Sequence, residues 1–154
     1  MSDSLSHHEV LDYVAENPVM VLGTLGADGT PHGAAIYGVA TSSDQLYFVT
    51  KTETQKCRDI VLHPTVSITI VNASENSSLQ ANGRARVENE PHTIEIVMTK
   101  ITSVYTRTAD WLPPIAKIRA GTYCIIGVKL RFVRLARFKG EPIGSAHIFR
   151  EGNA

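Results

Sequence analysis

The sequence predicts a mainly β protein: an antiparallel barrel or sandwich of at least six strands with peripheral helices. Three observations lead to this fold class. Short segments with apolar residues at alternate positions recur along the chain, turn residues separate several of them so closely that they pair as hairpins, and helical periodicity is confined to three stretches. The chain lacks the regular alternation of strand and helix that is typical of a doubly wound parallel sheet.

The first elements follow directly from the N-terminal sequence. Ser6-His7-His8-Glu9 is a capping box, so we expect a helix that ends near Asn17. Three strands are predicted next, at residues 19–25, 33–40 and 45–50. The Asp28-Gly29 pair between the first two strands predicts a tight hairpin turn, because glycine readily adopts the positive backbone dihedral that such a turn needs.

The remaining elements show the same mixture of alternating strands and short helices. Thr52-Glu53-Thr54-Gln55 is a second capping-box pattern, which predicts a short helix that ends near His63-Pro64. Further strands are predicted at residues 66–70, 79–87 and 122–138. Pro91 suits the first turn of a third helix. In the last strand the apolar alternation changes phase between Phe132 and Val133, which predicts a bulge or a sharp bend.

Length and composition limit the possible classes of protein. A chain of 154 residues, 43% hydrophobic and 19% charged, is expected to form one globular domain over residues 1–154. No apolar run approaches the roughly 20 residues of a membrane span, and the N-terminus has no signal-peptide pattern, so we expect a cytoplasmic protein without membrane contact. Cys57 and Cys124 are expected to be reduced, buried thiols. The six histidines have no metal-ligand spacing, so no metal site is predicted.

Charge is distributed unevenly along the sequence. The net charge is zero, yet all 15 Lys and Arg residues lie within residues 51–154. Residues 1–50 contain Asp and Glu but no Lys or Arg. The overall balance argues against nucleic acid as a partner. The segment from Lys117 to Lys139 is basic and contains no acid. Its last part, with Arg131, Arg134, Arg137 and Lys139, is interpreted as a solvated strand face, with phosphate contacts to nucleic acid as the alternative. The role of the whole segment stays unassigned.

The segment from Val49 to Lys56 is the strongest candidate for a binding site. A strand ends here and a helix begins at once, so unpaired N–H groups and the positive end of the helix dipole lie beside Thr50, Thr54 and Lys56. This combination suits a phosphate group. The alternative is an ordinary capped helix with solvated lysines. A second candidate is the polar face of the strand at 79–87, which could hydrogen-bond a planar ligand or could be plain barrel exterior.

Four segments in order carry a resemblance to a known family. They are VMVLGTLGADGTPHGAAIY, DQLYFVTKTETQK, HPTVSITIV and LQANGRARV. With this spacing the chain resembles the pyridoxamine 5′-phosphate oxidase-like, FMN-binding split-barrel family, in particular its small general-stress-protein-type members. The resemblance implies an antiparallel split β-barrel with peripheral helices. It also implies a homodimer with flavin sites at the interface between the subunits.

The resemblance implies a set of FMN-binding residues. The phosphate would be held where the third strand meets the short helix, by Val49, Thr50, Thr54, Gln55 and Lys56. The isoalloxazine ring would lie against the backbone of Ala34, Ala35 and Ile36, whose mostly small side chains permit close approach. A glutamine of the family falls by register on Ser78, and Gln80 is two residues further on the same side.

This sequence departs from the true oxidases of the family. Those enzymes carry Arg at the position of Ala34 and Lys at that of Val39, and they end in an Arg-Leu-rich substrate motif that the C-terminal tail FKGEPIGSAHIFREGNA lacks. Oxidation of pyridoxamine phosphate is therefore not expected. Trp111 and Tyr105 could reach the flavin from the partner chain, with core packing as the alternative, and no catalytic residue is predicted.

The function implied by the resemblance is hydride or electron transfer at bound FMN, on a small-molecule substrate that the sequence does not identify. A module that holds flavin, deazaflavin or haem without turnover is the first alternative. A barrel without cofactor that serves as an interaction protein is the second. The missing charges at Ala34 and Val39 favour these alternatives.

Overall fold

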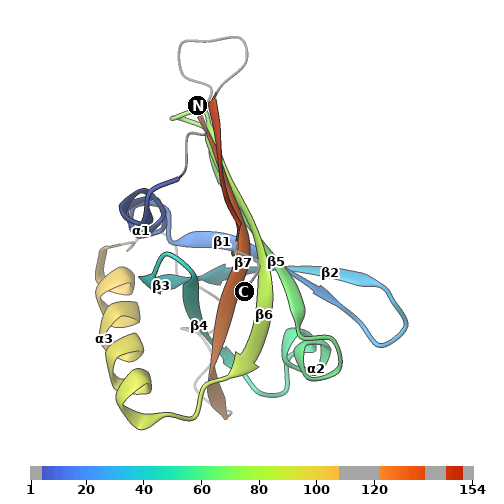
Figure 1. The fold of residues 1–154 in the computed structure, drawn as a ribbon. Coiled ribbons are helices and arrows are strands. Elements are labelled where there is room, and N and C mark those ends of the chain that lie inside the picture. The colour runs from blue at the N-terminus through green and yellow to red at the C-terminus, as the bar shows by residue number, and fades with distance from the viewer. Residues whose placement is uncertain (1–4, 108–121, 138–144, 151–154) are drawn as a thin grey trace.

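The computed structural model describes residues 5–107, 122–137 and 145–150, and its strands form one antiparallel sheet that curls into a half-barrel (Figure 1). The helices are α1 (His7–Glu16), α2 (Gln55–Leu62) and α3 (Pro91–Arg107). The strands are β1 (Val19–Leu25), β2 (Pro31–Tyr37), β3 (Val39–Ser42), β4 (Gln45–Lys51), β5 (Thr65–Asn72), β6 (Ser77–Val87), β7 (Tyr123–Arg137) and β8 (Ser145–Arg150). The predicted mainly β class with peripheral helices is confirmed. Within these described ranges, no helix is long and apolar enough to cross a bilayer.

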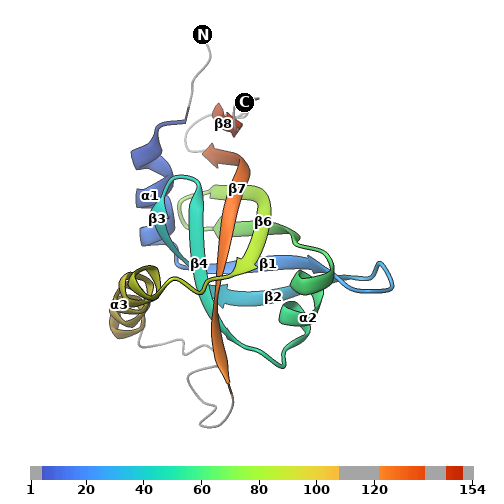
Figure 2. The same cartoon turned by 60° about the horizontal axis from the view of Figure 1, so that its bottom comes forward.

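The sheet follows the order β2-β1-β5-β6-β7-β4-β3, and β8 pairs with β7 beside this path. β7 is the longest strand, and it pairs with β6 along most of its length and with β4 along its first half. Figure 2 shows β7 running across the molecule between β4 and β6. β7 therefore joins the β3–β4 hairpin to the rest of the sheet.

Two apolar clusters fill the fold. The larger lies inside the curled sheet and includes Leu22, Ile68, Leu79 and Val133, each almost fully buried, and α1 adds Val10 and Val14 to it. In the smaller cluster α3 packs on the other side of β3 and β4 through the buried residues Val97, Ile101 and Val104. Figures 1 and 2 both place α3 and α2 on opposite sides of the sheet.

The first helix begins as its capping box predicts. The Ser6 hydroxyl accepts a hydrogen bond from the Glu9 backbone N–H at 3.3 Å, and the Ser6 N–H donates to the Glu9 carboxylate at 2.9 Å. These reciprocal bonds satisfy N–H groups at the helix start.

The single strand predicted for residues 33–40 is wrong, because the structure divides this segment into β2 and β3. The division falls at Gly38, whose N–H donates to the Pro18 carbonyl at 2.9 Å. A Cβ at this position would lie 2.5 Å from the Met20 sulfur, so any larger residue would require the Met20 side chain to move. β2 pairs with β1 and β3 pairs with β4, so the break lets one short segment serve both ends of the sheet.

The predicted irregularity in the last strand is confirmed. Asn82 of β6 lies opposite Phe132 of β7, but the next residue, Gly83, lies opposite Leu130. Arg131 is therefore the extra residue of a bulge. This insertion explains why the apolar alternation of β7 changes phase, since Leu130 and Val133 both point into the core.

Candidate functional site

The start of α2 departs from the capping box predicted at Thr52. The N-cap is Thr54, and no side chain among the described residues caps the first N–H groups of the helix. The Thr54 hydroxyl donates to the Lys51 carbonyl at 2.8 Å, and the Thr52 hydroxyl donates to the Glu53 carboxylate at 3.0 Å. Both hydroxyls are thus committed to other acceptors, and the first turn of α2 presents N–H groups that can bind an external acceptor.

Thr50 and Lys56 complete the surroundings of this turn. Thr50 is buried at the end of β4, with its hydroxyl oxygen 3.3 Å from that of Thr54. Lys56 is half-buried, and this burial lowers the pKa of its ammonium group. Partial loss of water disfavours the charge of Lys56, so a bound anion would stabilise it. We call Thr50, Thr54 and Lys56, together with the first-turn N–H groups, the candidate phosphate site.

Gln55 has a different environment from its neighbours in this turn. Its amide NH₂ donates to the buried carboxylate of Asp59 at 2.7 Å, and its amide oxygen accepts from Arg58 at 3.0 Å. Asp59 also accepts from the Thr24 hydroxyl at 2.6 Å and from His32 Nδ1 at 2.8 Å. The side chain of Gln55 therefore orients the start of α2, and its backbone N–H is the part that can bind a ligand.

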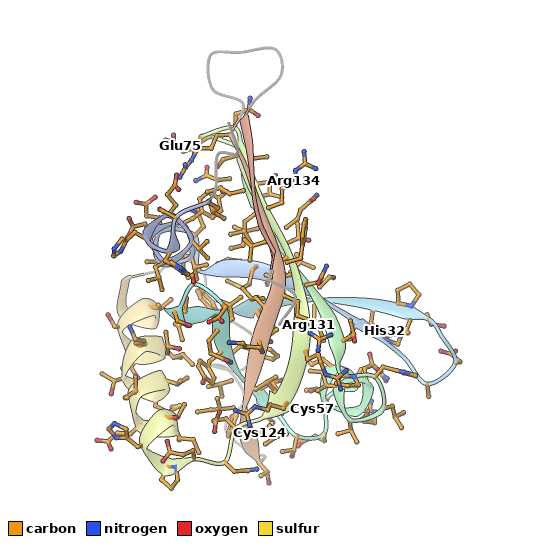
Figure 3. All side chains as sticks on the ribbon, in the orientation of Figure 1. His32, Cys57, Glu75, Cys124, Arg131 and Arg134 are labelled. Atoms are coloured by element: carbon orange, nitrogen blue, oxygen red, sulfur yellow. The ribbon has the colours of Figure 1, made fainter. Side chains whose placement is uncertain are left out.

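The Asp59–His32 hydrogen bond attaches β2 to α2 (Figure 3). Ala34 follows His32 by two positions, so it lies on the same side of β2, about 7 Å further along the strand. Ile36 continues this side and is buried in the larger cluster, whereas Ala35 is exposed on the opposite side. Of the three residues predicted to border a flavin ring, Ala34 and Ile36 share the His32 side of β2, and only Ile36 of these two is buried in the larger cluster.

Ser78 and Gln80 lie on the outer face of β6. They line a small hollow of about 90 Å³ together with Arg134 and Ala136 of β7. The register places one row of residues across this face, in the order Arg134, Gln80, Thr69, Val21 and Ala35. Gln80 is three strands from Ala35, or roughly 14 Å. The predicted site residues thus divide between this outer face and the start of α2.

Val49 lies apart from both groups. It packs against the smaller cluster beneath α3, on the opposite side of β4 from Thr50. Val39 is buried in the same cluster. Only the backbone of Val49 remains a candidate for contact with a ligand at the candidate phosphate site.

The fold is shared with known proteins. A family model described as pyridoxamine 5′-phosphate oxidase matches residues 6–134. The chain belongs to the pyridoxamine 5′-phosphate oxidase family. Among curated proteins, none matches the chain.

Solved structures with the same fold include three whose descriptions differ. General stress protein 26 from Bacillus anthracis is 20% identical with a TM-score of 0.64, covering 93% of this chain and 97% of that one. A pyridoxamine 5′-phosphate oxidase-related, FMN binding protein from Nostoc punctiforme is 14% identical with a TM-score of 0.62, covering 91% and 84%. An F420 reductase is 22% identical with a TM-score of 0.61, covering 84% and 96%. At these identities the likeness shows a shared fold.

The basic segment of this family member is only partly within the described residues. Lys129 forms an ion pair with Asp44, and Arg137 forms one with Glu9 at 3.3 Å. Arg131 and Arg134 are exposed on β7 (Figure 3). These observations fit the interpretation as a solvated strand face. Trp111, Lys117 and Lys139 of the sequence predictions lie outside the described ranges. The side chain of Tyr105 does too, although its backbone belongs to α3.

The sequence predictions missed the cluster around Asp59 and the contact between the two cysteines. Thr24, His32 and Asp59 come from β1, β2 and α2, so no local motif contains them. One signal was available, because Asp59 is a charged residue in the predicted helix at a position four residues after Gln55, where the two side chains share a helix face.

Proposed function

We propose that this member of the family binds FMN, with the FMN phosphate at the candidate phosphate site. One observation carries the proposal: the first turn of α2 has no side-chain cap, and the half-buried residue Lys56 belongs to that same turn. Backbone N–H groups and an ammonium are donors that suit a phosphate in proteins, and the Thr50 hydroxyl lies beside them. The donor set of this chain therefore fits the group.

We further propose an oxidoreductase that acts on a small-molecule substrate in the cytoplasm. Bound FMN supplies hydride or electron transfer, while the chain binds and orients the cofactor. Ala34 leaves room for a flat ring beside β2, close to the point where His32 attaches β2 to α2. A deazaflavin cofactor is the alternative that a specific observation favours, namely the shared fold with an F420 reductase. A non-catalytic holder of flavin or haem is the remaining alternative.

The proposed assembly is a homodimer with a flavin site at each side of the interface. The outer face of β1 and β5 supports it, because Val21 is 49% exposed and Val71 is 71% exposed on this face. Small residues at Gly33 and Ala35 on the adjoining strand would let a second copy approach closely. Such a partner would also cover Gln80, the polar residue that lies away from the start of α2 within one chain.

The test is FMN affinity after Lys56→Met, which removes the charge and keeps the apolar stem. We expect FMN to bind about 5- to 150-fold more weakly, which corresponds to the ~1–3 kcal/mol of a charge-assisted hydrogen bond. Fluorescence quenching of free FMN measures the dissociation constant. The fold should survive, because burial already disfavours the charge that the substitution removes.

Lys100→Met on α3 is the matched control and should leave FMN affinity unchanged. Equal affinity in wild type and Lys56→Met would place the phosphate elsewhere. Wild-type protein that binds a deazaflavin or haem but no FMN would favour the corresponding alternative.

The proposed reaction has its own test. Loss of the yellow flavin colour on addition of NADH or NADPH under anaerobic conditions would support turnover, and a colour stable to both would favour a passive holder.

A further inference from the structure

Cys57 and Cys124 contact one another although 67 residues separate them in sequence. Their Sγ atoms are 3.6 Å apart, and both thiols are free. Cys57 belongs to the first turn of α2, and Cys124 is the second residue of β7, opposite Thr50 of β4. Figure 3 shows the two side chains close together below the centre of the molecule. The contact between the two sulfurs therefore lies between the start of α2 and the start of β7.

Reagents in solution can reach the pair. Cys57 and Cys124 both line an open, largely apolar groove of about 450 Å³, which Val61, Leu62 and Val87 extend along α2 and the end of β6. Cys57 is buried, and Cys124 is partly exposed. Two sulfurs at contact distance that share one open groove are arranged for reaction with each other through a small thiol reagent.

We propose that Cys57 and Cys124 are an oxidisable dithiol that forms an intramolecular disulfide by exchange with a small-molecule disulfide. One cysteine thiolate attacks the reagent disulfide, which forms a mixed disulfide and releases one reagent thiolate. The second cysteine then attacks the protein sulfur of the mixed disulfide and releases the other thiolate. Two protein thiols are oxidised, one reagent disulfide is reduced to two thiols, and the two protons pass to those thiols.

The geometry needs little adjustment for this step. A disulfide bond is about 2.05 Å long, so the two sulfurs, now 3.6 Å apart, must approach by roughly 1.6 Å. Oxidation would link the start of α2 to β7 covalently. The proposal stands on the two sulfurs and the groove, and it does not depend on FMN binding.

The test treats the reduced wild-type protein with oxidised glutathione in mildly alkaline buffer. This condition is chosen because burial and the adjacent Cys57 raise the pKa of the Cys124 thiol to about 12, which slows exchange at neutral pH. We expect the intact mass to fall by about 2 Da and both thiols to become unreactive toward a maleimide after denaturation. A non-reducing digest should contain the Cys57 peptide joined to the Cys124 peptide.

Cys57→Ser and Cys124→Ser are the paired controls. Each should stop at a stable glutathione adduct, because the second sulfur is missing. Wild type that accumulates glutathione adducts, forms disulfides only between chains, or retains both thiols would overturn the proposal. Because the decisive measurement uses wild-type protein, a variant that fails to fold does not affect the conclusion.

Discussion

Asp59 shows how much one side chain can organise in this fold. Its carboxylate is fully buried and accepts hydrogen bonds from Thr24 of β1, His32 of β2 and Gln55 of α2. Since a carboxylate only accepts, His32 must donate through Nδ1. One charged group therefore positions the β1–β2 hairpin against the turn that carries the candidate phosphate site.

This arrangement predicts a specific dependence of stability on pH. The hydrogen bond from Thr24, with those from Gln55 and His32, holds the pKa of Asp59 at about 2 despite burial. Unfolded Asp has a pKa of roughly 3.9, so the folded state binds this proton less readily, and the carboxylate stabilises the fold above about pH 4. That contribution is lost as the pH falls toward 2.

We expect Asp59→Asn to lower the thermal unfolding midpoint by several degrees at pH 7, with a difference from wild type that shrinks as the pH falls below 4. Asp12→Asn, at an exposed position on α1, is the control and should change little. Thermal unfolding followed by circular dichroism across this pH range checks the prediction. A constant difference from wild type down to acidic pH would contradict the assigned role of the charge.

The residues of the candidate phosphate site are close together in the sequence, whereas those of the Asp59 cluster are not. Thr50, Thr54 and Lys56 lie within seven consecutive residues, so the order of strand and helix is enough to bring them together. Two partners of Asp59, His32 and Thr24, are 27 and 35 residues away, and only the tertiary pairing of β1, β2 and α2 brings them to it. The Cys57–Cys124 contact was missed for the same reason.

At the scale of the elements, β6 and β7 approach each other closely at the bulge. A Cβ on Gly83 would overlap the Lys129 carbonyl oxygen, and would lie 2.8 Å from its carbon and 2.9 Å from the Leu130 Cα. All three atoms belong to the β7 backbone, which cannot rotate away as a side chain can. A residue with a side chain at position 83 would therefore disturb the pairing of β6 with β7 at the bulge.

We expect Gly83→Ala to destabilise the fold by about 1–3 kcal/mol or more, as overpacking against rigid neighbours does. Gly33→Ala in β2 is the matched control, because its Cβ would meet only a Val21 methyl at an ordinary 3.7 Å. Urea unfolding of both variants measures the difference. Equal stability of the two would mean that the bulge adjusts more easily than its backbone contacts indicate.

The segment from 33 to 40 is divided at Gly38 between β2 and β3, and the local sequence pattern does not predict this division. Alternation and small residues predict extended backbone from 33 to 40, and nearly all of that segment is extended. At the interruption the Gly38 N–H donates to the carbonyl of Pro18, a residue 20 positions earlier in the chain. Local pattern therefore identifies the conformation of this segment but does not identify its pairing partners.

At the scale of the whole molecule, the uneven charge of the sequence becomes a set of contacts within the chain. Glu9 and Asp44 belong to the half without bases, and they pair with Arg137 and Lys129 of β7. Such exposed pairs contribute at most about 1 kcal/mol each. Within the described residues, the acidic and basic halves thus meet in one chain, so pairing of the halves does not itself require a partner.

The proposed dimer rests instead on the exposed valines of the outer sheet face. We expect Val21→Glu to convert a wild-type dimer to monomer, because a charge buried in such an interface has no partner. Sedimentation velocity measures the change. Val61→Glu on α2 is the control, since Val61 is 76% exposed on a different surface. A monomeric wild type, or a variant that stays dimeric, would contradict the proposed interface.

The position of β7 in the sheet also has a consequence for the order of folding. β3 and β4 pair with each other early in the chain, but their hairpin gains a neighbour in the sheet only when β7 arrives. Strands β1, β2, β5 and β6 can assemble before that, through shorter loops with lower closure entropy. During synthesis the edge of β4 that pairs with β7 therefore stays unpaired until most of the chain has been made.

Pulse-labelled hydrogen exchange during refolding should show the amides of β1 and β5 protected before those of β4. Simultaneous protection of all three strands would show that the sheet closes in one step.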